Sequence, residues 1–505
     1  MEKHHKLLVV LLIVLGFSLR LYYFASPLGR SSEVTVDEAV YGIQAIRIMN
    51  GDRPVFYPAQ DYTGSFSAYI SAAVFSIFGV TVWGLKIVPF IFSVGTVWLI
   101  YLLAKKTFSQ NVGLFTLLIA ALGTPFWNNW SSRAGTGYVE ATFVGLLLLL
   151  TTLQITQKEN TSKNLMLYFT GLGFLSGLGF WMQPTIVYFI IPSMIFLFAN
   201  LRRRFFVPFI FFCLGFMVGG FPVIYYNVLI KPSGTTGALF KKPWGVRGAL
   251  LKLLSEGFPV LLGGRTSNST KDFNFLTSSF IYLFFVFSVF YFLKVASVLR
   301  SVKRPEFLIL LTTVSTIAIF LTSTPFNQLS IEPRYIFSLY SVIPIFLGTF
   351  MERVARFSTP VSLAVILLFS LNSILGLTMA GPPTFLDGYS FKPLVSFLSK
   401  QRVDYIVSTP SLGHRVMFLS GGVVKASVRG GGITEVRFEK TNQEVTRARD
   451  LDPRLVAYVC KSDEPELDSF RTEGLSQYGQ NYLEENIGGA YTVIYSNKSV
   501  PKLSL

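Results

Sequence analysis

The chain has 505 residues, of which 51% are hydrophobic and only 14% are charged, and its formal net charge is +17. Repeated uncharged apolar runs of about 20 residues exclude an ordinary soluble protein and indicate a polytopic membrane protein. The positive charge does not indicate nucleic acid binding, because Lys and Arg cluster in short segments between the apolar runs, as they do in membrane proteins. Two distant cysteines and three scattered histidines exclude a disulfide framework and a histidine metal site.

Eleven apolar segments are predicted to be transmembrane helices, and the first is a retained anchor because no small-residue cleavage site follows it. They cover residues 6–24, 84–104, 111–126, 137–155, 166–181, 184–201, 205–229, 276–294, 305–322, 334–350 and 358–379. With a cytoplasmic N-terminus, the basic segments between spans fall on the cytoplasmic side, as expected for a multi-pass protein of the cell membrane. The C-terminus is then extracytoplasmic. Nearly all ionisable residues beside the spans lie on that side, which favours a single site there.

The first outer loop, residues 25–83, is long for a connection between spans. It is predicted to contain a surface helix that begins after Thr35 and a second helix in the apolar stretch 67–80, which is surface-lying or re-entrant rather than a span. Long ordered loops tend to be functional.

The start of the first surface helix contains two adjacent acids. Thr35 and Glu38 have the spacing of a capping box, and Asp37 lies in the first turn, where the helix dipole favours an anion. Asp37 and Tyr41 share one face of this helix. A capped amphipathic helix on the membrane surface explains the pattern, and the functional alternative adds a role for Asp37 in accepting a proton from a substrate hydroxyl.

Residues 127–140 join two spans on the same side. This segment contains Arg133, Tyr138 and Glu140. Arg133 and Glu140 either pair with each other, or Glu140 supports Asp37 or the acceptor while Arg133 binds an anion.

Two further outer segments contain arginines. The basic loop 230–275 includes Arg247 and is either solvated or caps a site that attracts a phosphate. Arg334 and Tyr335 open the tenth span. An arginine there either snorkels to the interface or binds phosphate with its planar guanidinium.

The composition changes at residue 381, which divides the chain into a membrane domain, 1–380, and a small extracytoplasmic α/β domain, 381–505. Strands are predicted at 405–407, 416–419, 455–459 and 491–495, and helices at 392–401 and 463–474. The glycine run 429–432 lacks a strand-to-helix context and is predicted to be a loop rather than a nucleotide-binding motif.

The order of these features resembles the GT-C superfamily of membrane glycosyltransferases, in the branch of protein mannosyltransferases and aminoarabinose lipid A transferases. The resemblance covers about residues 5–350. It is carried by four segments with the sequences VDEAVYGIQAIRIMNGDRPVF, FSIFGVTVWGLKIVP, NNWSSRAGTGYVEATF and IEPRYIFSLYSVIP.

The resemblance implies that Asp37 matches the catalytic acid of the first loop, that Glu140 matches a second acid that is normally aspartate, and that Arg334 matches a late arginine near the donor phosphate. Residues 60–66 lack the usual proline pair and its preceding lysine. The Trp-Trp-Asp-Tyr-Gly signature of oligosaccharyltransferase catalytic subunits is also absent, which argues against transfer of a whole glycan.

The resulting expectation is transfer of a sugar from a polyprenyl-phosphate donor to a hydroxyl of a lipid, glycan or protein acceptor on the extracytoplasmic side. The expected residues are the catalytic acids Asp37, Glu38 and Glu140, the phosphate-binding Arg133, Arg247 and Arg334, and the pocket residues Tyr41, Tyr138 and Tyr335. No cofactor is required if arginines neutralise the phosphate, and Mg²⁺ or Mn²⁺ held by Asp37 and Glu140 is the alternative. The rival functions are a lipid or polysaccharide transporter or assembly protein without catalysis, and an inactive family member acting as a scaffold. Acids confined to one face favour the enzyme over a transporter.

Overall fold

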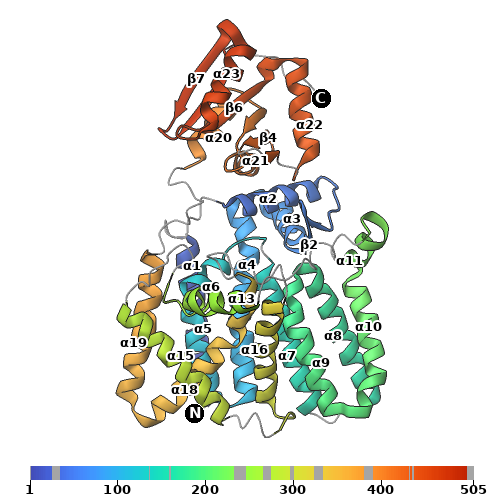
Figure 1. Cartoon of the computed structure of the whole chain (residues 1–505), viewed down its shortest axis with the longest axis vertical. Coiled ribbons are helices and arrows are strands. Elements are labelled where there is room, and N and C mark those ends of the chain that lie inside the picture. The colour runs from blue at the N-terminus through green and yellow to red at the C-terminus, as the bar shows by residue number, and fades with distance from the viewer. Residues whose placement is uncertain are drawn as a thin grey trace. The chain divides into compact units, whose positions relative to one another are not determined.

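The computed structural model describes residues 2–25, 34–135, 137–157, 161–232, 246–265, 275–295, 301–322, 334–379, 390–430, 433–434 and 437–497. The chain forms two compact units, and each is described by itself (Figure 1). Unit 1 comprises Met1–Gly29, Asp61–Phe66 and Ile87–Gly381, and unit 2 comprises Arg30–Gln60, Ser67–Lys86 and Pro382–Leu505. Most of the first outer loop therefore belongs with the C-terminal residues, whereas composition alone placed it with residues 1–380.

Unit 1 is almost entirely helical. Its elements are α1 (Glu2–Ala25), α4 (Val82–Thr107, which begins in unit 2), α5 (Gln110–Leu122), α6 (Pro125–Trp130), α7 (Tyr138–Gln157), α8 (Ser162–Met182), η1 (Pro184–Ile186), α9 (Val187–Leu201), η2 (Arg202–Phe205), α10 (Phe206–Gly219), α11 (Phe221–Tyr225), η3 (Tyr226–Ile230), α13 (Val246–Lys252), η4 (Leu253–Gly257), α14 (Phe258–Leu261), α15 (Phe275–Val295), α16 (Pro305–Thr322), η6 (Arg334–Ser341), α18 (Ile343–Phe357) and α19 (Thr359–Met379). Eight helical segments in the described part of the chain are long and apolar enough to cross a membrane. The predicted multi-pass architecture is therefore confirmed.

The number of spans differs from the eleven expected. The expected spans 184–201 and 205–229 are present as α9 and α10, which count as one candidate, Pro184–Gly219, because η2 joins them without a gap. The chain turns between them at Arg202, the C-cap of α9, which has a positive φ of 50°. The expected span 111–126 falls on α5, which is shorter than a full span. The expected span 358–379 corresponds to α19, a helix of 21 residues. In α5 the cause is local, because the helix ends at Gly123, which has a positive φ of 65°.

Small residues set the spacing of two neighbouring helices in unit 1. Figure 1 shows α8, α9 and α10 side by side. A Cβ atom on Gly173 of α8 would lie 2.0 Å from the carbonyl oxygen of Phe212, and one on Gly215 of α10 would lie 2.2 Å from that of Thr170. Glycine therefore lets the two backbones touch, as small residues do in membrane helix pairs.

A buried arginine fixes the C-terminal end of α5. Arg20 of α1 donates hydrogen bonds to the carbonyl oxygens of Ala120 (3.0 Å), Ala121 (2.9 Å) and Gly16 (3.0 Å), and to Ser93 Oγ (2.8 Å). A cation at a helix C-terminus interacts favourably with the helix dipole and satisfies the last carbonyl groups. The charge of Arg20 is thus used in packing, although it lies in a predicted span.

Unit 2 contains a six-stranded mixed sheet with the strand order β5-β4-β3-β6-β8-β7. The C-terminal elements are α20 (Lys392–Lys400), β3 (Tyr405–Ser408), α21 (Gly413–Leu419), β4 (Lys425–Gly430), β5 (Ile433–Thr434), α22 (Glu439–Leu451), η7 (Pro453–Leu455), β6 (Val456–Lys461), α23 (Glu466–Tyr478), η8 (Gly479–Asn481), β7 (Tyr482–Ile487) and β8 (Tyr491–Ser496). Strand β3 runs parallel to β4 and β6, and β8 runs antiparallel to β6 and β7. The predicted C-terminal α/β domain is confirmed in class.

The individual predictions for this domain were mostly right. Strands β3, β6 and β8 and helices α20 and α23 lie where they were expected. The strand predicted at 416–419 is wrong, because these residues form part of α21. Val416, Met417 and Phe418 are all buried, because this short helix is covered on several sides. Its sequence is therefore an unbroken apolar run, which a buried strand would also have.

The two predicted loop helices are present as α2 (Val36–Met49) and α3 (Phe66–Phe78). Between them lie the short strands β1 (Phe56–Tyr57) and β2 (Gln60–Gly64). Helix α2 packs on α21 inside unit 2, and Phe418 lies so close to Gly42 that a Cβ atom there would be 2.3 Å from its ring. The rings of Phe418 and Phe75 are also stacked, 6.1 Å apart. Helix α2 is therefore built into the core of the C-terminal unit.

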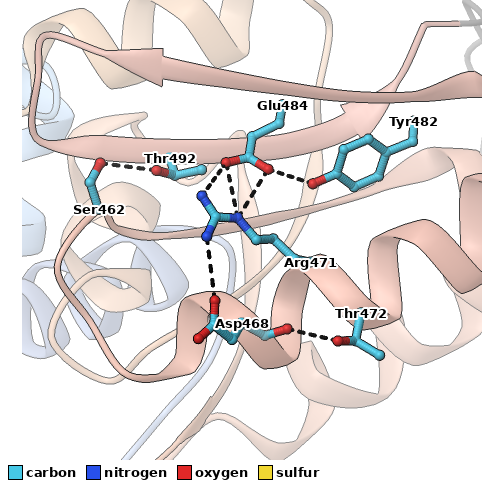
Figure 2. A network of polar contacts seen from close by, with 7 residues as sticks. All are labelled: Ser462, Asp468, Arg471, Thr472, Tyr482, Glu484 and Thr492. Carbon is cyan, nitrogen blue, oxygen red and sulfur yellow. Dashed lines mark hydrogen bonds and ion pairs between the residues drawn. The ribbon is translucent and has the colours of Figure 1, made fainter.

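A polar network fastens α23 to the edge strand β7 (Figure 2). Arg471 Nη2 lies 2.7 Å from Glu484 Oε1, and the same guanidinium reaches Asp468 at 3.3 Å. Tyr482 donates to the other oxygen of Glu484. The hydrogen bonds from Arg471 are the main reason why the pKa of Glu484 lies below its usual value. This network joins α23 to the edge of the sheet.

Candidate active site

The capping box predicted at the start of α2 is confirmed. The Glu38 N–H donates to Thr35 Oγ1 at 3.2 Å, and the Thr35 N–H donates to Glu38 Oε2 at 2.8 Å. Glu38 is only 2% exposed, and its second oxygen, Oε1, lies 3.7 Å from Nζ of the buried Lys86. The carboxylate of Glu38 is thus engaged on both oxygens in holding the helix start.

Asp37, the neighbouring acid, is placed quite differently. Its side chain is 58% exposed. Oδ1 accepts a hydrogen bond from the Tyr57 hydroxyl at 3.2 Å and lies 3.7 Å from Nη1 of Arg437. No contact within the described ranges reaches Oδ2. Asp37 is therefore a carboxylate with one oxygen held and the other open, which suits a group that accepts a proton from a bound molecule.

Tyr41 contacts the tyrosine that holds this acid. Its side chain is buried, and its ring lies 4.6 Å from that of Tyr57. Tyr41 therefore supports the tyrosine whose hydroxyl contacts Asp37. Tyr57 and Arg437 were not predicted. Tyr57 directly follows the family-like segment that ends at Phe56, which was a usable signal, but nothing in the sequence singled out Arg437.

In unit 1, three of the predicted residues come together. Tyr138 begins α7 and Tyr335 lies in η6, and their ring centroids are 6.4 Å apart. The Arg334 guanidinium lies 5.2 Å from the ring of Tyr335. On the other side, the ring of Tyr138 is 5.7 Å from that of Trp130.

Arg133 closes the far end of this aromatic cluster. Its guanidinium lies 4.6 Å from the Trp130 ring, and its Nε–H donates to Asn129 Oδ1 at 3.2 Å. Two arginines thus flank three aromatic rings, at the end of α6 and at the starts of α7 and η6. A guanidinium on an aromatic face is held in place, and its charge attracts an anion.

Two other predicted residues give less information. Glu140 lies in the first turn of α7 and is 0% exposed. Arg247 lies at the start of α13, and its side chain is outside the described part of the structure. Asp37 belongs to unit 2, whereas Glu140 and Arg334 belong to unit 1. The single cavity expected to contain all three stays a prediction.

An ion pair occupies the segment that departs from the family pattern. Asp61 Oδ2 lies 2.5 Å from Lys231 Nζ, and Asp61 Oδ1 accepts a hydrogen bond from Tyr226 at 2.7 Å. Burial raises the pKa of Asp61, but these hydrogen bonds outweigh it and leave the pKa below its ordinary value. Lys231, one of the basic residues of loop 230–275, is therefore already neutralised.

The described residues contain no group of three or more His, Cys, Asp or Glu side chains arranged to hold a metal ion. The divalent-ion alternative would need Asp37 and Glu140, which lie in separate units. It stays a prediction, and no step proposed below passes through a metal.

Comparisons with known proteins agree on the fold. Residues 64–226 match the model of the dolichyl-phosphate-mannose-protein mannosyltransferase family. No curated protein matches the sequence.

Solved structures match over almost the whole chain. ArnT from Cupriavidus metallidurans bound to undecaprenyl phosphate matches with a TM-score of 0.62 and 12% identity over 97% of both chains. Its apo form matches with a TM-score of 0.60 and 13% identity over 95% of this chain and 97% of that one. The oligosaccharyltransferase AglB from Archaeoglobus fulgidus, in complex with an inhibitory peptide and a dolichol-phosphate, matches with a TM-score of 0.54 and 14% identity over 99% of this chain and 75% of its own. The resemblance seen in the sequence is confirmed: this chain has the fold of the GT-C membrane glycosyltransferases, with a protein-mannosyltransferase family segment at residues 64–226.

Proposed function

We propose that this protein is a membrane glycosyltransferase that moves a sugar from a polyprenyl-phosphate donor to an acceptor hydroxyl on the extracytoplasmic side. The fold, the family segment and the eight candidate spans support this class of enzyme. The distribution of Lys and Arg between spans supports a cytoplasmic N-terminus and an extracytoplasmic site.

The observation that carries the proposal is the contrast between the two adjacent acids of α2. Glu38 is buried and uses both oxygens in contacts with Thr35 and Lys86. Asp37 is exposed, and only its Oδ1 is held. We therefore assign the catalytic role to Asp37 and a structural role to Glu38.

Asp37 acts as the general base in one displacement step. Its carboxylate takes the proton of the acceptor hydroxyl while that oxygen forms a bond to the anomeric carbon of the sugar. The bond between the anomeric carbon and the phosphate oxygen breaks, and the lipid phosphate leaves with the negative charge. Attack opposite to the leaving group inverts the anomeric configuration. A positioned general base contributes about 10²–10⁴-fold to such a step.

The arginines of unit 1 neutralise the leaving phosphate. Arg334 and Arg133 lie at the two ends of the Trp130–Tyr138–Tyr335 aromatic cluster. Planar guanidinium groups suit phosphate oxygens, and they stabilise the charge that develops on the leaving group. Tyr138 and Tyr335 would then face the donor, and Arg247 is a third candidate for phosphate contact. Glu140, which is buried, supports the site without taking part in the chemistry.

The ligands of the structural relatives support the class of donor. ArnT was solved with undecaprenyl phosphate and AglB with dolichol-phosphate, which are both polyprenyl-type lipid phosphates. The acceptor of the present chain is a lipid, a glycan or a protein hydroxyl, and the sugar is a hexose or a pentose.

The test is transfer of radiolabelled sugar from a panel of polyprenyl-phosphate donors to membrane acceptors, first with membranes and then with purified protein. We expect transfer by the wild type and none by Asp37→Asn. Transfer undiminished in Asp37→Asn would overturn the assignment of the base. The absence of transfer from every donor would favour a transporter, an assembly protein or an inactive scaffold.

A further inference from the structure

Within unit 2, helix α22 of the C-terminal domain is fixed against α2. Arg47, in the last turn of α2, places its guanidinium 4.6 Å from the ring of Phe438 and donates to Thr441 Oγ1. Phe438 is the N-cap of α22, and Thr441 lies in its first turn. The C-terminal end of α2 therefore holds the start of α22 by stacking and by a hydrogen bond.

This fixation determines where Arg437 lies, because Arg437 directly precedes Phe438. Its Nη1 is 3.7 Å from Oδ1 of Asp37, and its guanidinium is 5.8 Å from the Tyr57 ring. The Arg437 side chain is only 23% exposed. The oxygen that it approaches is the one that accepts the Tyr57 hydrogen bond.

Two groups from different parts of the chain thus act on one carboxylate oxygen. Tyr57 comes from the first outer loop, and Arg437 comes from the C-terminal domain, 400 residues after Asp37 in the sequence. With Oδ1 held by two groups, rotation of the carboxylate is restricted, and Oδ2 is left for the acceptor hydroxyl. A base held in one orientation loses less entropy when it takes a proton in the transition state.

We propose that Arg437 is a positioning residue for Asp37, so that the C-terminal domain completes the catalytic base. This inference rests on the proposed function, in which Asp37 is the base. It gives the C-terminal domain a direct part in the transfer step, beyond any role in recognising the acceptor. It also predicts that Arg437 affects turnover rather than binding of the donor.

The test compares Arg437→Gln and Arg437→Lys with the wild type in purified full-length protein. A matched control is Arg454→Gln, which removes an arginine–aspartate pair of the same unit, Arg454 with Asp452, that does not touch Asp37. We expect kcat to fall roughly 10- to 100-fold in Arg437→Gln, with the KM for the donor changed less than about threefold. Lysine should recover a substantial part of kcat because it restores the charge, and the control should keep the wild-type kcat. The thermal midpoints of the four proteins should agree.

The inference and the proposed function fail in different ways. If Asp37→Asn transfers sugar at the wild-type rate, the base assignment is wrong, whatever Arg437→Gln does. If Asp37→Asn is inactive but Arg437→Gln keeps the wild-type kcat, only the positioning role is overturned. The positioning role is also overturned if Arg437→Gln changes only the KM, or if Arg437→Lys has a kcat as low as that of Arg437→Gln.

A second measurement keeps the inference testable if Arg437→Gln is unstable. Tyr57→Phe and Arg437→Lys each weaken the hold on the same oxygen of Asp37, so their combined loss of kcat should be smaller than the product of the single losses. Independent, multiplicative losses would overturn the shared-oxygen arrangement.

Discussion

The starts of helices α2 and α7 have similar sequences but different environments. Each helix has an acid in its first turn, Asp37 in α2 and Glu140 in α7, where a helix dipole favours an anion. The Asp37 side chain is 58% exposed and is approached by Tyr57 and Arg437, whereas Glu140 is 0% exposed. Position at a helix start therefore explains why both acids are tolerated, but exposure separates them, because Asp37 is open to solvent and Glu140 is enclosed by the protein.

The largest expected effect is on Asp37. We expect Asp37→Asn to lower kcat by about 10²–10⁴-fold, because an amide cannot take the proton of the acceptor hydroxyl. Single-turnover transfer of labelled sugar by purified protein measures this loss. Folding should be unaffected, since the side chain is mostly exposed. An unchanged kcat in Asp37→Asn would show that the exposed acid of α2 has no more part in the chemistry than the buried acid of α7.

Glu38→Gln should affect stability instead of chemistry. The amide can still accept the Thr35 N–H, but Lys86 would stay buried without its counter-ion, at a cost of about 3 kcal/mol. Thermal unfolding in detergent should show a clearly lower midpoint, while kcat per folded molecule stays within about threefold of the wild type. The double variant Glu38→Gln/Lys86→Met should recover most of the midpoint. Loss of kcat without loss of stability would instead indicate that Glu38 is catalytic.

Acidification should loosen the unit that holds Asp37. Burial, helped by the charge of Arg437, lowers the pKa of His414 from 6.5 to about 4. Between these values the unfolded chain takes up a proton that the folded unit does not. The stability is therefore complete above pH 6.5 and falls toward pH 4, by up to about 3 kcal/mol.

Hydrogen exchange, corrected for intrinsic rates, can measure this pH dependence in peptides of α21 and β4. His414→Gln should remove the His414 contribution. If exchange in the His414→Gln variant depends on pH as steeply as in the wild type, the pH dependence comes from other groups. If peptides of α7 show the same change in exchange, the effect is not confined to unit 2.

The smallest expected effect is on Glu140. Because this acid is buried, we expect Glu140→Gln to keep the shape of its site and to lower kcat by less than about tenfold. The same single-turnover assay measures it beside Asp37→Asn. A loss as large as that of Asp37→Asn would make Glu140 a second catalytic acid, as the family resemblance implies.

Local sequence patterns predicted the local structures well. The Thr35–Glu38 spacing gave the observed capping box, and the apolar stretch 67–80 gave α3. Patterns failed where burial comes from several sides, as in α21, and where a helix ends early, as at Gly123. In these places the environment, and not the pattern, decides the outcome.

The candidate site proposed here contains residues that local patterns could indicate and residues that they could not. Asp37, Tyr138, Arg334 and Tyr335 were recognisable because each stands beside an apolar span or in a family-like segment. Tyr57 and Arg437 stand in neither, and they matter only because folding brings them to Asp37.

The sequence by itself determined the membrane class, the capped helix start with its two acids, and the α/β character of the C-terminal domain, because hydropathy, capping and strand patterns act over short distances along the chain. Tertiary structure alone decided which of the two acids is open, and that helix α2 packs with residues some 400 positions later. Burial and long-range contacts depend on the whole packed unit, which no local pattern of residues encodes.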